Sequence, residues 1–230
     1  LTGMGGPPLF STPRGAGDDE EAARILGNSF TLLLLFGVLL TAAGLAVKTP
    51  LLRALGASDA TLPYADAYLT VYLFGSVFVS LSLGLNSFIN AQGFARTGML
   101  TVAIGAVLNL ILDPLFIMVF HMGVQGAALA TILSQAVSAA WTLRFLTGRK
   151  TLVRLSLQHM RFGARRVGKI LALGLSGFIM AITNSLVQMA CNASLQAYGG
   201  DIYVGVMTVI NSVREVAQMP VNGATNSAQP

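Results

Sequence analysis

Charged residues are scarce in this 230-residue sequence, which contains 14 Lys or Arg and 9 Asp or Glu, or 10% of the chain. Soluble globular domains carry about 25%. Hydrophobic residues make up 54%, so a soluble fold and intrinsic disorder are both excluded. The single cysteine excludes an internal disulfide and lacks the neighbours of a metal-ligand pattern. The composition therefore predicts an integral membrane protein.

Six long apolar runs follow one another along the chain. A helix needs about 20 apolar residues to cross the roughly 30 Å hydrocarbon core of a bilayer. The runs of that length cover 25–47, 67–95, 98–120, 123–143, 170–200 and 202–230. They are continuous rather than alternating, which favours helices over barrel strands. We predict an all-α, multi-pass helix bundle in the cell membrane, and we interpret the apolar ends of the sequence as those of an internal fragment.

Basic residues are concentrated on one side of these spans. Eleven of them precede the first span, separate the second from the third, or lie in the loop 144–169: Arg14, Arg24, Arg96, Arg144, Arg149, Lys150, Arg154, Arg161, Arg165, Arg166 and Lys169. Lys48 and Arg53 would lie on the other side. The positive-inside rule therefore places the long basic loop in the cytoplasm. Membrane orientation explains this loop better than nucleic-acid binding does.

One carboxylate stands out because it interrupts an apolar hairpin. Asp113 would cost a few kcal/mol in lipid, and Pro114 disfavours helical geometry at Asp113 itself. Asn109 lies one turn away on the same face, and Thr131 has the same depth on the returning helix if the hairpin turns at Met122. These oxygen groups suit Na⁺, and a carboxylate also suits H⁺. Local capping and helix–helix hydrogen bonds are the alternative explanation.

Two further polar groups could line a cavity. Asn184, Gln188 and Asn192 recur at intervals of four, which places them in one stripe along the fifth span. Arg214 and Glu215 interrupt the last span. Helix–helix hydrogen bonding explains the stripe nearly as well, and a water-filled mouth would explain the charged pair.

Enzyme motifs are absent from the sequence. It contains no GxSxG, no HExxH, no phosphate-binding GxxxxGK[ST] and no Cys/His cluster. We therefore predict no enzyme activity and no cofactor other than a coupling ion.

Several motifs resemble those of the multidrug and toxin extrusion (MATE) transporters. They are GAGD at 15–18, NSFINAQG at 86–93, NLILDP at 109–114, GVQGAALAT at 123–131, MPVNG at 219–223 and AQP at 228–230. The resemblance covers essentially the whole chain. One departure is the run 11–13, where family members usually have a Ser-Arg pair.

The resemblance implies two six-helix lobes with alternating access. Residues 1–148 would hold the amino-terminal lobe from the end of helix two to helix six, 149–169 the cytoplasmic linker, and 170–230 helices seven and eight. Family members bind a cation with an Asp on helix one, an Asn and an Asp on helix five, and a Thr on helix six. The matching residues here are Asn109, Asp113 and Thr131, with Na⁺ as one candidate ion. The helix-one Asp would precede Leu1.

The expected function is secondary active efflux of drugs or organic cations, driven by Na⁺ or H⁺ antiport in a bacterial inner membrane. We expect a monomer whose partners are small-molecule substrates and the lipid bilayer. A related flippase for lipid-linked or polymeric substrates is the alternative, and it would need a cationic cavity for which Arg214 is the candidate. A structural membrane subunit and an intramembrane enzyme are further alternatives.

Overall fold

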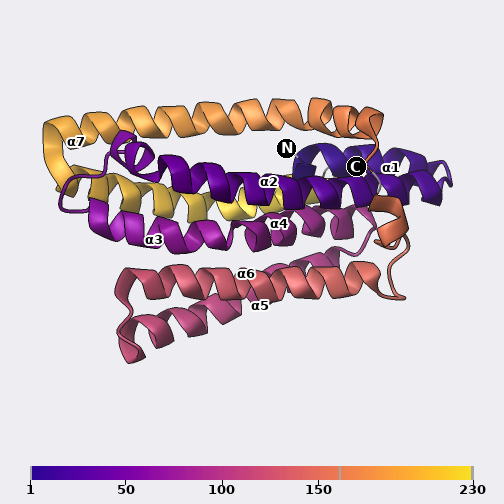
Figure 1. Ribbon diagram of the computed structural model, residues 1–230, viewed down its shortest axis with the longest axis horizontal. Helices are drawn as coiled ribbons and strands as arrows, with labels where there is room; N and C mark the ends of the chain where they lie inside the picture. Colours follow the sequence, from indigo (N-terminus) through magenta and orange to yellow (C-terminus); the bar gives the residue numbers. More distant parts are fainter. Residues whose placement is uncertain (1, 161, 229–230) are drawn as a thin grey trace.

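The computed structural model describes residues 2–160 and 162–228, and all regular elements in these ranges are helical (Figure 1). They are α1 (Thr2–Gly15), α2 (Asp19–Ala54), α3 (Leu62–Phe74), α4 (Ser76–Ala91), α5 (Ala95–Pro114), the π-helix η1 (Leu115–Val119), α6 (Gly123–Thr147), the 3₁₀-helix η2 (Leu157–Met160) and α7 (Ala164–Ala228). The chain is a helix bundle with long apolar helices, as the composition predicts.

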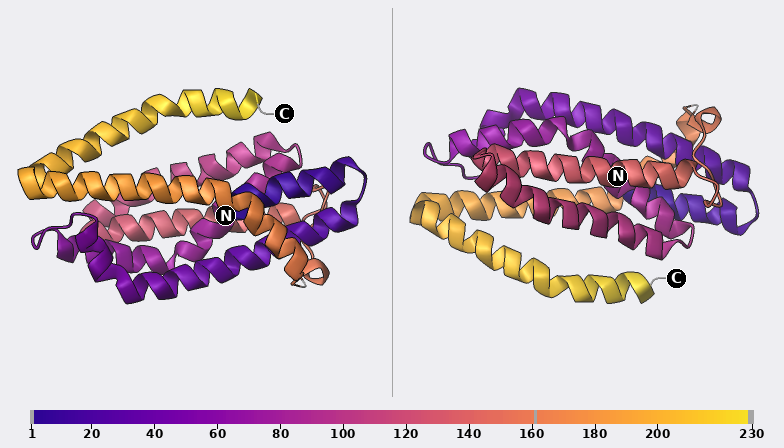
Figure 2. Two further views of the ribbon diagram at one scale, coloured as in Figure 1. Left: turned by 90° about the horizontal axis from the view of Figure 1, so that it is seen from above. Right: turned by 90° about the horizontal axis from the view of Figure 1, so that it is seen from below.

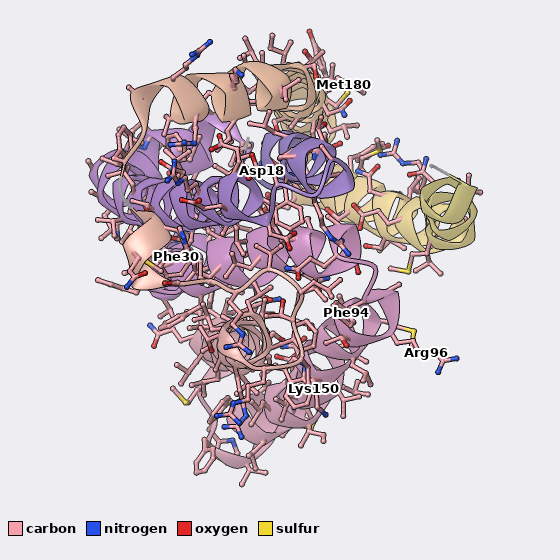
Figure 3. The ribbon with its side chains drawn as sticks, turned by 90° about the vertical axis from the view of Figure 1, so that its right-hand side faces the viewer. Asp18, Phe30, Phe94, Arg96, Lys150 and Met180 are labelled. Carbon is pink, nitrogen blue, oxygen red and sulfur yellow. The ribbon has the colours of Figure 1, made fainter. Side chains whose placement is uncertain are left out.

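The connections alternate between the two ends of the bundle. Figure 1 shows the α1–α2 turn, the α4–α5 turn and the segment after α6 at one end, and the α2–α3 loop, the η1–α6 turn and the bend of α7 at the other. The described basic residues before α2, at the start of α5 and after α6 therefore share one end, and Figure 3 faces this end with Arg96 and Lys150 labelled. This arrangement agrees with the orientation predicted from charge, so we call that end cytoplasmic.

The prediction of one continuous span over 67–95 is wrong in one respect, because the structure forms two helices there that meet at a bend. Helices α3 and α4 meet at Gly75 with a bend of 57°. A side chain at Gly75 would collide with Ile132 of α6, so glycine permits the close approach. Thr41 of α2 donates to the carbonyl of Leu73 at 2.8 Å, and Ser76 donates to the carbonyl of Gly37 at 3.1 Å. These hydroxyls satisfy polar groups beside the bend.

The predicted loss of helical geometry at Asp113 is also wrong. Helix α5 continues through Pro114, and the irregularity follows as the π turn η1. The amide of Phe120 bonds the carbonyl of Leu115 at 3.0 Å, in the wider pattern of a π-helix. Proline has no amide to donate, and the wider turn after it keeps the next amides bonded within the helix.

Helix α7 consists of two helices joined at Gly200, where φ is 66° and ψ is −167°. Glycine tolerates a positive φ because it has no Cβ. Four helices are long and apolar enough to cross a membrane, and the bent α3–α4 pair makes a fifth candidate. Because the break at Gly200 divides α7, all six predicted runs have a helical counterpart. Figure 2 shows the part of α7 after the break running back apart from the other helices.

The buried core lies toward the cytoplasmic end, between α1, α2 and α4. Phe10 of α1 packs edge-on against Phe88 of α4 with ring centroids 5.6 Å apart. Leu26 of α2, Leu146 of α6 and Ile170 of α7 are fully buried in the same cluster. The start of α7 is thereby packed into the amino-terminal part of the molecule.

The basic segment after α6 is held against the helix ends by side-chain hydrogen bonds. Gln92, buried at the end of α4, accepts from the Thr151 hydroxyl at 2.7 Å and from the amides of Leu152 and Val153 at 3.1 Å each. Asn28 of α2 is also buried and accepts from the amide of Gly163 at 2.8 Å. The described part of the segment predicted as a linker therefore packs on the bundle, while the division into lobes at 149–169 remains a prediction.

An ion pair fastens the start of α7 to the start of α2. Arg166 donates twice to the Glu21 carboxylate, with both N–O distances at 2.7 Å. Glu21 precedes the apolar run of α2, so it lies outside the membrane-spanning part. The hydrogen bonds from Arg166 lower the pKa of the Glu21 carboxyl below its ordinary value. Both side chains are about a third exposed or less, and the two parallel bonds fix their relative orientation.

Replacing Gln92 by Leu should release the basic segment. Two loop amides would lose their acceptor, at a cost of about 1–3 kcal/mol each. We expect trypsin to cleave the purified chain after Arg149, Lys150 or Arg154 about tenfold faster or more, because local opening becomes more populated. Gln125→Leu, the same change at an exposed position of α6, is the control. Equal cleavage rates in the two variants would contradict the role of Gln92.

Candidate cation-binding site

Three predicted site residues meet between α5 and α6. The side-chain amide nitrogen of Asn109 lies 3.3 Å from a carboxylate oxygen of Asp113 and 3.4 Å from the hydroxyl of Thr131. Thr131 also donates to the carbonyl of Ala127 at 3.0 Å. All three side chains are half-buried. Residues far apart in sequence therefore place an amide, a carboxylate and a hydroxyl in one cluster.

The register of the hairpin differs slightly from the one predicted by counting residues from Met122. That count puts Asp113 at the depth of Thr131, whereas Asn109, one turn deeper, makes the hydrogen bond to Thr131. The difference has a structural cause, because η1 lies between Asp113 and the hairpin turn. A π turn holds more residues per turn than an α-helix, so the residues of α5 sit closer to the turn than a regular α-helix would place them.

The cluster offers oxygen atoms that a small cation could bind. Within the described residues, the side-chain oxygen of Asn109 and the second carboxylate oxygen of Asp113 make no hydrogen bond. The amide group of Asn109 donates to Asp113 and to Thr131. A cation bound among these three side chains would take the place of the two donated protons. Rotating that amide by about half a turn would present its oxygen instead. Carboxylate, amide and hydroxyl oxygens are ligands for hard cations.

A cavity of about 180 Å³, lined by both apolar and polar side chains, adjoins the cluster on its cytoplasmic side. Asn109 and Thr131 line it together with residues of α4, α5 and α6: Ser82, Leu83, Val102, Gly105, Ala106, Ser134, Gln135 and Ser138. The hydroxyl of Ser134 and the side-chain oxygen of Gln135 are buried and have no hydrogen-bond partner within the described residues. A space of this size with several polar atoms can hold ordered water. The cluster therefore borders a cavity suited to water or a hydrated ion.

Sequence reasoning missed the serines and the glutamine of this cavity. Their spacing carried a signal, because Thr131, Ser134, Gln135 and Ser138 recur every three or four residues on one face of α6. Gly105 lies one turn from Asn109 on α5, and it leaves room where a side chain would collide with the Ser138 hydroxyl. A search for small and polar residues at helical spacing around Asp113 would have found this face.

The other predicted cavity-lining residues lie on α7, away from this cluster. Gln188 donates to Asn192 at 3.3 Å, while Asn184 is exposed. Arg214 and Glu215 are exposed on the part of α7 that follows the break, and the described residues contain no ion pair between them. The structure does not bring these five residues to Asn109, and their lining of a cavity stays a prediction.

Proteins whose names refer to multidrug resistance or multidrug export are similar to this chain in sequence. The MatE family model matches residues 1–115. "Probable multidrug resistance protein YpnP" of Bacillus subtilis is 29% identical over 221 residues, covering 95% of this chain and 49% of that protein. "Multidrug export protein MepA" of Staphylococcus saprophyticus is 28% identical over 199 residues, with 86% and 44% covered. The chain thus spans about half the length of the curated relatives it matches.

Solved transporter structures share the arrangement of the helices. A structure of the MATE multidrug transporter DinF-BH in complex with R6G is 34% identical, with a TM-score of 0.91 over 96% of this chain and 50% of that one. An inward-facing multidrug resistance MATE family transporter of the MOP superfamily is 28% identical, with a TM-score of 0.89 over the same shares. The matched transporters and the apolar helices identify a multi-pass membrane protein. By its sequence and its fold, the chain belongs to the MatE family.

Proposed function

We propose that this chain forms part of a secondary active exporter of drugs or organic cations that is driven by Na⁺ or H⁺ antiport with alternating access. The observation that carries the proposal is the contact of Asn109 with both Asp113 and Thr131 across two helices. The matched relatives have multidrug export names, which supports a small-molecule substrate. This function requires transport rather than catalysis, and the coupling ion would be the cofactor.

The proposed coupling is an equilibrium between conformations. An ion that binds better to one arrangement of α5 and α6 shifts the transporter toward it, by no more than its differential affinity for the two arrangements. The site spans two helices, so a change in their spacing alters the distances between its oxygens. An ion that draws the oxygens of Asn109, Asp113 and Thr131 together therefore favours the arrangement in which α5 and α6 are close.

The flippase alternative has less support. It needs a cationic cavity, and its candidate cation Arg214 is exposed on α7 with no hydrogen bond or ion pair within the described residues. The cavity beside Asn109 is lined by neutral side chains. Uncharged walls next to a single carboxylate suit a small cation better than an anionic lipid-linked substrate.

Asp113→Asn should abolish ion-driven efflux. The substitution keeps the size of the side chain and removes the negative charge that would bind the ion. In cells that express the transporter containing this sequence, we expect ethidium efflux to fall about tenfold or more, since losing 1.4 kcal/mol of ion binding is a tenfold change. Asp59→Asn, in an exposed loop where the side chain is 92% exposed, is the matched control. Normal efflux by the Asp113 variant that still collapses with an ionophore would refute the role of Asp113.

The two possible ions predict different results for Thr131→Val. A bound Na⁺ would lose a hydroxyl ligand, so the Na⁺ concentration giving half-maximal efflux should rise about tenfold. A proton needs the carboxylate alone, so H⁺ coupling predicts an efflux–pH profile close to that of the unchanged protein. Measuring efflux against Na⁺ at fixed pH, and against pH without Na⁺, distinguishes them. A Thr131 variant that loses all efflux under both conditions would instead point to a structural role, which circular dichroism would check.

A further inference from the structure

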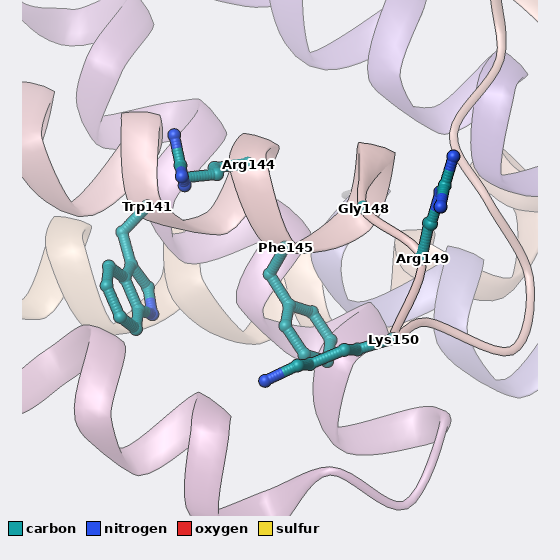
Figure 4. A pocket seen from close by; sticks show the side chains of 6 residues that line it. All are labelled: Trp141, Arg144, Phe145, Gly148, Arg149 and Lys150. Carbon is teal, nitrogen blue, oxygen red and sulfur yellow. The ribbon is translucent and has the colours of Figure 1, made fainter.

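A second cavity, of about 400 Å³, lies at the cytoplasmic end of α6, away from the cluster of Asn109 and Asp113. Its lining residues are Trp141, Arg144, Phe145, Gly148, Arg149 and Lys150. Figure 4 shows the Lys150 side chain extending past Phe145 toward Trp141, with Arg144 and Arg149 on the other flank of the helix end. Lys150 thus lies beside the two aromatic rings, and the two arginines extend from the opposite side of the helix end.

The three basic residues of this cavity lack acidic partners. Within the described part of the chain, none of Arg144, Arg149 and Lys150 forms an ion pair, and all three are exposed. The sequence has no acidic residue between Asp113 and Asp201. By contrast, Arg166 is neutralised by Glu21. The cavity therefore presents uncompensated positive charge at the level of the cytoplasmic membrane surface.

An apolar path leads from these charges along the outside of α6. Leu133, Val137 and Trp141 follow at intervals of four, and each is at least 40% exposed. Residues with this spacing lie on one face of a helix. Tryptophan is enriched where membrane meets water, and Trp141 lies at the junction of the path and the basic residues. The Phe145 ring is fixed by an edge-on contact with Phe94, with centroids 5.2 Å apart.

We infer that this cavity binds the headgroup of an anionic phospholipid, with an acyl chain along Leu133, Val137 and Trp141. Basic pockets on the cytoplasmic side of membrane proteins bind anionic headgroups, because each nearby Lys or Arg contributes attraction. The ammonium group of a zwitterionic lipid offsets this attraction, so the pocket prefers an anionic lipid. A soluble phosphate would match the cations but would leave the apolar path uncovered. This inference does not depend on the proposed efflux function.

The sole tryptophan of the chain makes this site directly observable. We would reconstitute the purified chain into phosphatidylcholine vesicles in which a small fraction of the lipid carries bromine atoms on its acyl chain, since bromine quenches nearby tryptophan fluorescence. The brominated lipid would be phosphatidylglycerol in one series and phosphatidylcholine in the other. We expect brominated phosphatidylglycerol to quench Trp141 several-fold more strongly than brominated phosphatidylcholine does. The reason is that each basic contact should raise the affinity for the anionic lipid about fivefold.

Two triple variants separate a site from general surface charge. Changing Arg144, Arg149 and Lys150 to Gln should reduce the quenching by phosphatidylglycerol to that by phosphatidylcholine. Changing Arg154, Arg165 and Lys169 to Gln removes the same charge from exposed positions of the same segment and should leave the difference intact. A variant that keeps the charge at the cavity, with Arg144→Lys, Arg149→Lys and Lys150→Arg, should also retain it. An unchanged Trp141 emission maximum in unbrominated vesicles would report an intact fold.

Three results would overturn the inference. Equal quenching by the two brominated lipids would mean that the cavity has no preference for an anionic headgroup. Equal loss in the two Gln variants would mean that overall surface charge attracts the lipid. Loss of the preference when inorganic phosphate is added at constant ionic strength would assign the cavity to a soluble anion instead.

Discussion

In the hydrocarbon core of a membrane, a polar group without a partner inside the protein costs several kcal/mol, and this cost limits where the helices can be irregular. The bend at Gly75 shows how the chain meets that limit. The hydroxyl oxygens of Thr41 and Ser76 lie 2.8 Å apart, and their two protons can reach the carbonyl of Leu73 at the bend and the carbonyl of Gly37 on α2. Ile132 packs where a side chain at position 75 would be. The bend is therefore stabilised by the Thr41 hydroxyl of α2, by the Ser76 hydroxyl at the bend itself and by close packing.

The same requirement explains how the basic segment is held at the cytoplasmic end. Residues 151–156 lie outside any regular helix or strand, and the buried Gln92 accepts from two of their amides. Further along, the buried Asn28 accepts from the amide of Gly163. The Arg166–Glu21 pair joins the start of α7 to the start of α2. A segment that carries many positive charges is thus ordered by neutral side chains and one ion pair, which leaves the remaining cations free to face lipid headgroups.

Patterns that repeat along a helix were predictable from the sequence, and contacts between distant residues were not. Hydropathy and charge predicted the spans and their orientation, and the spacing around Asp113 predicted its grouping with Asn109 and Thr131. Hydropathy is continuous across Gly75, so the sequence gives no sign of the bend there. The contact that requires glycine at this position is with Ile132, which lies far away in sequence. Proline rules predicted a break at Asp113, but the π turn after Pro114 absorbs the missing donor. The role of Gln92 could not be predicted from local spacing, because its partners lie about 60 residues further along.

The cost of a buried polar group without a partner also bears on the proposed coupling, because two such groups lie near Asn109. The cavity there contains the buried oxygens of Ser134 and Gln135, which have no hydrogen-bond partner in the part of the chain that the structure describes. Each such group carries a cost of about 1–3 kcal/mol unless something solvates it. Water or a cation in the cavity would lower that cost, so the free energy of the cavity depends on its occupancy. Because Ser134 and Thr131 lie on α6 and Asn109 lies on α5, occupancy acts on the contact between these two helices. Under the proposed coupling, an ion held by Asp113 would therefore alter the packing of the hairpin through the polar groups beside it.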